Sequence, residues 1–394
     1  RRLRAAVFFR PGDMTLLVGL FRLLKFIALA ALLLVSTSAA GQESCAAPRP
    51  VCDVRRAVFE IAAWDPFGSA VRIGPGRLVT NRHIVADHEQ VTIKLTGGGK
   101  ITARVIPTAY RGDLVLLEAK GLPGAEPPAL GEIEGDGALY VVAAELRPRR
   151  IAVHAPGRVV LLPAEGKPLA RLHHSAASGP GTSGGAVVDA DGRLVAIVAA
   201  GGEGRNEAIP SSEIARLEAA SGPARQETSQ RIGTAYRECA ETLERIPRRR
   251  VTLARRAVER IVERCTASGN RQLFDLAGQV LGRAGRHGES AALFGRALDQ
   301  DPHAINARIG LVVTLHFALR HRDAVPHLEW LLQVAPADAQ VLRLAVQAGR
   351  FGGNSVLAER ALQLIEEHHP RMAPAARGFL GRAGPGGQAP RPRR

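Results

Sequence analysis

Short apolar runs separated by Gly, Pro and Asp fill the chain between residues 54 and 217. Runs of this length that are rich in β-branched residues and bounded by turn residues are typical of β-strands. The expected strands are Val58–Ala62, Val71–Ile73, Leu78–Thr80, Val91–Leu95, Ile101–Ile106, Leu114–Glu118, Leu139–Ala144, Ile151–His154, Arg158–Leu162, Ala186–Val188 and Leu194–Ala200. Many short strands at such spacing favour an all-β barrel or sandwich.

The pattern becomes helical after Pro223, where strand signals disappear. Residues 225–268 predict two helices, and a repeat of 34 residues follows them. Its four columns are Pro302, Pro336 and Pro370; Ser290, Ala324 and Ala358; Phe294, Leu328 and Leu362; and Ala297, Leu331 and Ile365. Small, apolar and proline columns at this period are typical of tetratricopeptide repeats, so the second region is expected to be an all-α array of that type.

Residues 1–40 are expected to be an export signal. Two cations precede an apolar core from Phe26 to Val35, and small residues that suit cleavage after Ala40 follow it. An uncleaved membrane anchor formed by residues 16–35 is the alternative, although the core is only about half of the 20 residues that span a bilayer. The expected location is the bacterial periplasm or the outside of the cell.

The four cysteines fit an oxidising compartment. Cys45 and Cys52 bracket a short loop after the signal, and Cys239 and Cys265 lie on the two predicted helices before the repeats. Two local disulfides, Cys45–Cys52 and Cys239–Cys265, are the expected pairing. The sequence has no Cys-x-x-Cys motif or Cys/His cluster, so neither a metal nor a cofactor is expected.

The net charge of +16 is uneven along the chain. Residues 41–222 have 20 basic and 20 acidic side chains, whereas residues 223–394 have 27 against 16, or +11. The excess is entirely arginine, and residues 248–264 are the most basic stretch. That stretch either docks on an anionic partner or lipid surface or is a solvated connector. The arginines could form a nucleic-acid face, but a GC-rich genome also explains them. Because export separates the chain from most nucleic acid, no such partner is expected.

Three motifs in the first region have candidate chemistry. TNRHIV places His83 where a strand runs into a turn, GDLVLL places Asp113 at the start of a strand, and GPGTSGG places Ser183 before another. A lone residue of each kind is normally structural, because Asp and Gly are common in turns. The three together, in this order and each at a strand edge, predict a catalytic triad of His83, Asp113 and Ser183.

The chemistry requires these residue types. A serine hydroxyl is a weak nucleophile at neutral pH and needs a base, which an imidazole supplies. A carboxylate then fixes the imidazole tautomer and stabilises the imidazolium. Glycines around Ser183 let backbone amides converge on a developing oxyanion, and we assign these amides to Gly181 and Ser183.

The order His–Asp–Ser with these motifs resembles the chymotrypsin superfamily of trypsin-like serine proteases, and within it the exported bacterial HtrA/Do branch. The resemblance covers residues 55–220 and implies two six-stranded β-barrels with the active site between them. Zymogens of the superfamily have Asp before the serine, whereas this chain has Thr182. Helical repeats replace the PDZ domains of that branch, so its peptide capture and cage assembly are not expected here.

The sequence gives weaker evidence for the specificity pocket than for the triad. The segment 175–178 should form its base, with Ala177 as a lining residue, and the strand after the serine should pair with the substrate backbone through Val198, Ala199 and Ala200. Neither segment carries an acid, so a small-to-medium apolar P1 residue is expected. His173 and His174 either line the pocket or are solvated residues at a strand end.

Two functions fit these features. The first is an exported serine endopeptidase that acts on protein or peptide substrates and recruits protein partners through its repeats. The second is a non-catalytic adaptor built on the repeats, with an inactive protease-like barrel. The intact triad favours the first. The expected organisation is a signal peptide at 1–40, a trypsin-like domain at 41–222, a helical connector at 223–270, repeats at 271–376 and a disordered tail at 377–394.

Overall fold

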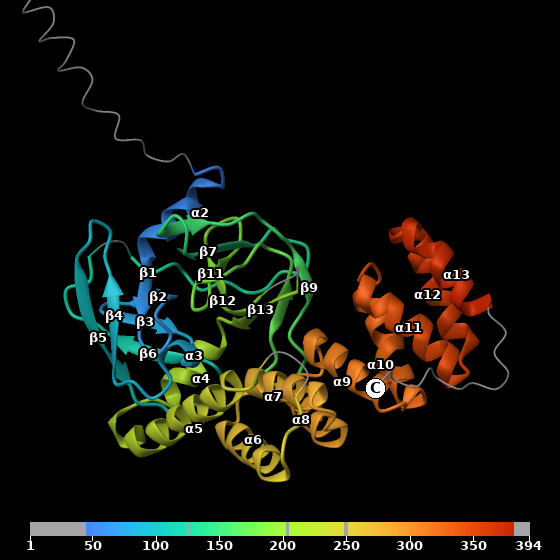
Figure 1. Ribbon diagram of the computed structural model, residues 1–394. Helices are drawn as coiled ribbons and strands as arrows, with labels where there is room; N and C mark the ends of the chain where they lie inside the picture. The colour runs from blue at the N-terminus through green and yellow to red at the C-terminus, as the bar shows by residue number, and fades with distance from the viewer. Residues whose placement is uncertain (1–44, 124–125, 202–204, 248–250, 382–394) are drawn as a thin grey trace, which may run out of the picture. The chain divides into compact units, whose positions relative to one another are not determined.

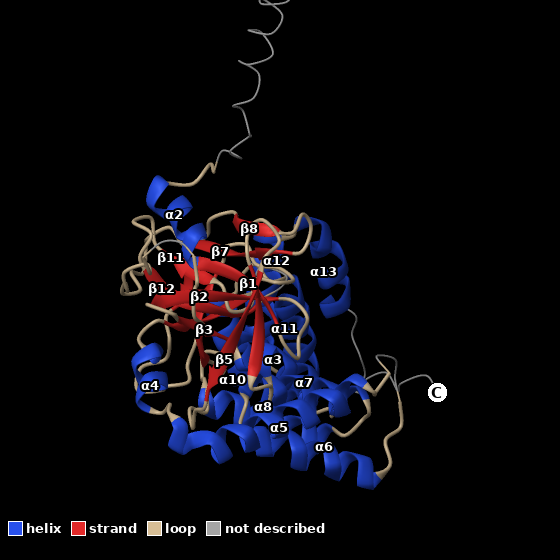
Figure 2. Ribbon diagram, turned by 90° about the vertical axis from the view of Figure 1, so that its left-hand side faces the viewer, coloured by secondary structure: helices blue, strands red, loops and turns tan. Residues whose placement is uncertain are grey.

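The computed structural model describes residues 45–123, 126–201, 205–247 and 251–381 (Figure 1). Within these ranges the strands come first along the chain and long helices follow; Figure 2 colours the strands red and the helices blue. The predicted export signal at 1–40 and the arginines at 248–250 lie outside the described residues. None of the helices in the described ranges is long and apolar enough to cross a membrane.

The first six strands form a closed antiparallel barrel in the order β1-β2-β3-β6-β5-β4. They are β1 (Val58–Ala62), β2 (Gly68–Gly74), β3 (Arg77–Thr80), β4 (Gln90–Lys94), β5 (Lys100–Ile106) and β6 (Val115–Glu118). Alternate side chains point inward, and Ile61, Leu78, Ile93 and Leu117 are completely buried there. Each such side chain contributes about 1.5–3 kcal/mol by leaving water.

The second half of the β-region is a seven-stranded sheet in the order β8-β7-β11-β12-β13-β10-β9. Its strands are β7 (Tyr140–Glu145), β8 (Arg150–Val153), β9 (Val159–Leu161), β10 (Leu172–His174), β11 (Ala186–Val188), β12 (Leu194–Ala200) and β13 (Asn206–Pro210). The resemblance implied a second six-stranded barrel. The sheet differs because β10 pairs with both β9 and β13, and the edge strands β8 and β9 form no pairing with each other in the described chain.

A shared apolar core joins the barrel to the second sheet. Val71, Val79 and Leu116 of the barrel pack in one buried cluster with Val142 and Ile197 of the sheet. This core fixes the junction between the two halves, and the three predicted triad residues lie on segments that leave strands of both.

Helices make up the chain after β13. They are α4 (Glu213–Ala219), α5 (Gln226–Glu244), α6 (Arg255–Ser268), α7 (Arg271–Arg283), α8 (His287–Gln300), α9 (Ile305–Phe317), α10 (His321–Val334), α11 (Ala339–Gly352), α12 (Ser355–His368) and α13 (Ala373–Gly381). We call α5–α13 the helical region. Its last helix continues to Gly381, beyond residue 377, where the disordered tail was expected to begin.

The helical region repeats in the register that the sequence predicts. The three pairs α7–α8, α9–α10 and α11–α12 begin at Arg271, Ile305 and Ala339, which are 34 residues apart. Gly278 lies against the Phe294 ring, where a Cβ would be 2.9 Å from the ring carbons, so a small residue is needed at this helix crossing. The helical pairs and their period agree with the predicted repeats, and the tetratricopeptide class stays a prediction.

Helix α5 joins the helical region to the barrel. Gly233 lies so close to the Ala86 carbonyl that any side chain there would overlap it. Arg237 Nη2 pairs with Asp87 Oδ2 at 2.9 Å, directly after α3 (Arg82–Val85). The guanidinium lowers the pKa of Asp87, although burial opposes this. The turn that carries His83 is therefore in contact with α5.

Disulfides occur where the cysteine positions predict them. Cys239 on α5 and Cys265 on α6 are bonded to each other, and both are completely buried. Cys45 and Cys52 are disulfide-bonded as well, and none of the described cysteines is free.

Candidate active site

Antiparallel pairing of β3 with β6 brings His83 and Asp113 together. Thr80 at the end of β3 is opposite Val115 at the start of β6. The chain therefore leaves β3 into α3 beside the segment that enters β6. His83 Nδ1 lies 2.7 Å from Asp113 Oδ2, and the His83 backbone N–H donates to Asp113 Oδ1 at 3.0 Å. Both carboxylate oxygens thus fix the histidine.

Asp113 remains a carboxylate despite its burial. The residue is 2% exposed, and burial by itself would raise its pKa. The charge and hydrogen bonds of His83, together with the Arg171 guanidinium, outweigh burial and hold the pKa of Asp113 below its ordinary value. The Asn81 amide holds the backbone of this turn by donating to the Asp113 carbonyl at 3.0 Å.

The turn around Ser183 is anchored to the barrel. The Ser69 N–H of β2 donates to the Ser183 carbonyl at 2.8 Å. Gly184 has a φ of 79°, and a side chain on it would overlap the Ser69 carbonyl and the Thr80 hydroxyl. A glycine is therefore required beside the serine, because no other residue tolerates both the backbone conformation and the close approach.

The serine and the amides around it are free to meet a substrate. In the described chain no hydrogen bond joins the Ser183 hydroxyl to the His83 imidazole, and such bonds often tighten only when a substrate binds. The Gly181 and Ser183 amides, the predicted oxyanion donors, likewise donate to no other described group. Gly181 has a φ of 96° and packs against the Phe67 ring, so its peptide is held in place.

Thr182 holds the oxyanion loop by local hydrogen bonds. Its hydroxyl donates to the Gly179 carbonyl at 2.8 Å and accepts from the Gly179 N–H at 3.2 Å. The residue is 3% exposed. The loop that zymogens hold with an Asp–ammonium pair is closed here by an internal clamp between residues 179 and 182.

The predicted substrate-binding residues differ in exposure. Ala177 is exposed, Val198 and Ala199 are buried, and Ala200 is half-buried. Strand β11 begins at Ala186, opposite Ile197, so the β11 side of residues 199–200 has no strand partner in the described chain. An extended peptide can pair at such an edge.

Asn206, a polar residue at the predicted pocket base, was not predicted from the sequence. A Cβ on Gly201 would be 2.6 Å from Asn206 Oδ1 and 2.9 Å from Ser178 Cβ, so these three residues converge. The Asn206 amide donates to the Ala176 carbonyl at 2.7 Å. Asn206 lies beyond the motifs, on a strand whose sequence is not apolar, and no local signal points to it.

His173 and His174 are both buried, so they are not solvated residues at a strand end. Burial, reinforced by the charge of His173, lowers the pKa of His174 to about 4. His174 is therefore neutral near pH 7. His173 Nε2 lies 3.8 Å from Asp301 Oδ2 of the helical region.

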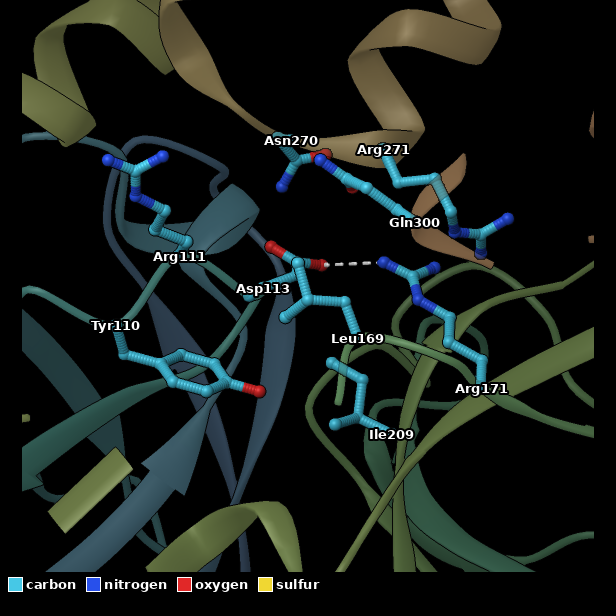
Figure 3. A pocket seen from close by; sticks show the side chains of 10 residues that line it. Tyr110, Arg111, Asp113, Leu169, Arg171, Ile209, Asn270, Arg271 and Gln300 are labelled. Carbon is cyan, nitrogen blue, oxygen red and sulfur yellow. Dashed lines mark ion pairs between the residues drawn. The ribbon is translucent and has the colours of Figure 1, made fainter. Parts of the chain in front are cut away.

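A small cavity of about 20 Å³ lies beside Asp113 (Figure 3). It is lined by barrel residues, by Arg171 and Ile209 of the second sheet, and by Asn270, Arg271 and Gln300 of the helical region. A cavity of this size holds about one water molecule. No cluster of His, Cys, Asp or Glu suited to a metal ion occurs among the described residues.

Residues 68–197, which include the His–Asp pair, match the family described as the trypsin-like peptidase domain. The inactive form of the Rv3671c protease is 22% identical with a TM-score of 0.38, over 45% of this chain and 98% of that one. The HtrA-type protease AlgW with tripeptide is 25% identical with a TM-score of 0.37, over 43% of this chain and 61% of that one. No curated protein matches the chain.

Proposed function

We propose that the protein is a serine endopeptidase with His83, Asp113 and Ser183 as its catalytic triad. The observation that carries this proposal is the 2.7 Å contact between His83 Nδ1 and the buried Asp113 carboxylate. It fixes the imidazole so that Nε2 can accept a proton. The Ser183 turn, anchored on β2 with two unused amides, supplies the nucleophile and the oxyanion site.

The reaction proceeds through an acyl-enzyme. Ser183 Oγ attacks the scissile carbonyl carbon while His83 Nε2 takes the hydroxyl proton. The tetrahedral oxyanion accepts hydrogen bonds from the Gly181 and Ser183 amides. His83 then gives its proton to the leaving amine, and the C–N bond breaks. Water, deprotonated by His83, attacks the ester and releases the acid and the free serine.

Substrate pairs as an added strand along residues 199–200, with its P1 side chain directed toward Ala177. The segment 175–178 has no charged group, and Ser178 and Asn206 are its polar residue and polar neighbour, which supports a small-to-medium apolar P1 residue rather than Lys or Arg. The substrates are proteins or peptides, and the repeats of the helical region recruit protein partners.

The test is covalent labelling of the full chain. Purified protein is incubated with an organofluorophosphonate probe and, separately, with unfolded casein. We expect one labelled serine, identified by peptide mass as Ser183, and cleavage of casein. Absence of both reactions in folded protein would contradict the proposed function and favour a non-catalytic adaptor.

Activity should not require cleavage near the start of the barrel. Arg55 donates to the Cys52 carbonyl and Arg56 pairs with Asp53 at the surface, so both arginines make local contacts only. Thr182 cannot form an ion pair with a new N-terminus. We expect the Arg55→Gln/Arg56→Gln variant to hydrolyse casein within about twofold of the unchanged protein, because exposed ion pairs contribute little.

N-terminal sequencing of the active species provides the control for this experiment. If the variant is inactive until a new N-terminus forms near residue 57, a zymogen mechanism operates and the role given to Thr182 is wrong.

We further propose that the protein is exported, with its disulfides formed in an oxidising compartment. The Cys239–Cys265 bond closes a loop with a sequence separation of 26 between α5 and α6. Replacing both cysteines with alanine should lower the free energy of unfolding of this helix pair by about 3 kcal/mol, because the unfolded chain regains loop entropy. Thermal unfolding followed by circular dichroism measures the loss.

Peptide mapping without reductant gives the companion measurement. Native protein should yield Cys239–Cys265 and Cys45–Cys52 peptides and no alkylatable thiol. Four alkylatable cysteines in folded protein purified from its native host would refute both the pairing and the compartment.

A further inference from the structure

A chain of buried charges leads from Asp113 toward the helical region (Figure 3). Arg171 comes directly before β10 and is 4% exposed. Its Nη2 lies 3.9 Å from Asp113 Oδ2, the same oxygen that His83 Nδ1 contacts. Its Nη1 donates at 3.1 Å to Glu207 Oε2 on the neighbouring strand β13. One guanidinium is thus shared between two carboxylates.

The helical region makes two contacts here, one with Glu207 and one with the Arg171 backbone. Arg271, the first residue of α7, pairs with the Glu207 carboxylate. Asp301, just after α8, accepts a hydrogen bond from the Arg171 backbone N–H at 3.2 Å. Glu207, Arg271 and Asp301 are 3%, 5% and 0% exposed. Arg171 is therefore fixed from the strand side by Glu207 and from the helical side by Asp301.

Stability alone is a poor explanation for this arrangement. A buried ion network roughly cancels its own desolvation cost, and apolar residues of similar size commonly stabilise a protein as well or better. The cavity beside Arg171 holds only about one water, so the guanidinium has little space to move away from Asp113. Its location beside the oxygen that holds His83 points to a role in the triad.

We propose that Arg171 is a positioning residue of the triad, and that the helical region acts through Glu207 and Asp301 to hold its guanidinium beside Asp113. This inference rests on the proposed function. The helical region is then a structural part of the active site and not only a recruitment surface. Arg171 acts through Asp113: its positive charge opposes protonation of His83, and the negative charge of Glu207 favours it.

Other charged or titratable groups near Asp113 come from three elements. They are Arg82 on α3, Tyr110 and Arg111 before β6, and Tyr236 on α5. Burial raises the pKa of both tyrosines, so they stay neutral near pH 7. Burial lowers the pKa of Arg82 to about 10, which leaves it charged at neutral pH.

Two groups at the far end of the network need a control. His173 faces Asp301, and Asp275 on α7 faces Arg271 and Glu207. Burial raises the pKa of Asp275 to about 7, so its charge changes in the range of the measurement. Each pH profile of the experiment described next is therefore measured a second time in proteins that also carry Asp275→Asn or His173→Gln.

The experiment measures the rate constant of fluorophosphonate labelling of the full chain from about pH 5 to 9. Arg171→Met should move the acidic limb of the profile to higher pH by about 1 unit, because a positive charge next to the carboxylate is lost. Glu207→Gln should move the limb to lower pH, because a negative charge is lost. Arg271→Met removes a positive charge farther from Asp113, so it should move the limb to higher pH by less than Arg171→Met does. Arg171→Lys keeps the positive charge and should leave the limb at its position in the unchanged protein.

Lys167→Met is the matched control. Lys167 lies on the same segment and donates to the Asp299 carbonyl of α8 at 3.2 Å, but it is exposed. Its removal deletes a cation from the same contact between sheet and helices, and the limb should stay in place. Opposite shifts for Arg171→Met and Glu207→Gln support the inference, because a purely structural role would not reverse sign with charge.

If the acidic limb lies at the same pH in all variants, or if Arg171→Met and Glu207→Gln shift it in the same direction, the inference is overturned while the proposed function stays intact. If Arg171→Met does not fold by circular dichroism, Glu207→Gln and Arg271→Met decide, because they are expected to move the limb in opposite directions. If the unchanged protein is not labelled at all, the proposed function fails. The midpoint of His83 titration, followed by NMR of the histidine-labelled full chain, then tests the inference with the same expected directions.

Discussion

Replacing Ser183 with alanine is expected to lower kcat for peptide hydrolysis by roughly a million-fold, as loss of a triad serine does elsewhere. The Ser183 hydroxyl is the proposed attacking group, and the neighbouring Thr182 hydroxyl is buried and bonded to Gly179. Its removal should leave the fold unchanged, because the turn is held by backbone bonds such as that from Ser69 N–H to the Ser183 carbonyl. Casein hydrolysis and probe labelling measure the loss.

Ser212→Ala is the matched control for this change. Ser212 is exposed and makes no side-chain capping bond at the start of α4, so activity and labelling should be unaffected. Persistent cleavage by rigorously purified Ser183→Ala protein would show that another residue is the nucleophile.

The second large effect is expected for Asp113→Asn, with a loss of about 10,000-fold in kcat. Both oxygens of Asp113 accept hydrogen bonds, one from the His83 backbone N–H and one from the His83 ring. An asparagine has a single oxygen, so its NH₂ group must face one of these donors. The arrangement that avoids a clash with the backbone N–H puts the ring proton on Nε2, where it blocks proton transfer from serine.

Asp191→Asn serves as the comparison, because Asp191 is exposed and pairs only at the surface with Arg193 at 3.1 Å. Its activity should be that of the unchanged protein. A loss below tenfold for Asp113→Asn would mean that the carboxylate does not set the tautomer of His83.

Sequence patterns were sufficient where apolar periodicity and local motifs determine structure. The barrel strands appear where β-branched runs predict them, and strand β12 has the predicted bounds, Leu194–Ala200. Two strands were not predicted: β10 (Leu172–His174) and β13 (Asn206–Pro210). Both bury His, Asn or Glu side chains that pair across the sheet or with the helices. Because these polar residues interrupt the apolar pattern, the sequence of each strand resembles that of a surface loop.

The site residues that were not predicted are those whose contacts are distant in the sequence. His83, Asp113 and Ser183 occur in motifs of a few residues, so the sequence indicates them directly. Arg171 has partners 36 and 130 positions away, at Glu207 and Asp301, and Arg271, which pairs with Glu207, is 100 positions away. No local pattern distinguishes such an arginine from a solvated one. Only the pairing of β10 with β13 and the packing of α7 against them identify it.

The order of the elements along the chain has a consequence for biosynthesis. Residues of the barrel and of the Ser183 turn leave the ribosome before α7 and α8 have been made. Until those helices arrive, Glu207 lacks Arg271 and the Arg171 backbone lacks Asp301. A nascent or truncated chain thus has an incompletely supported Asp113 carboxylate. Under the proposed function, the triad gains its full surroundings only when translation of the helical region has finished.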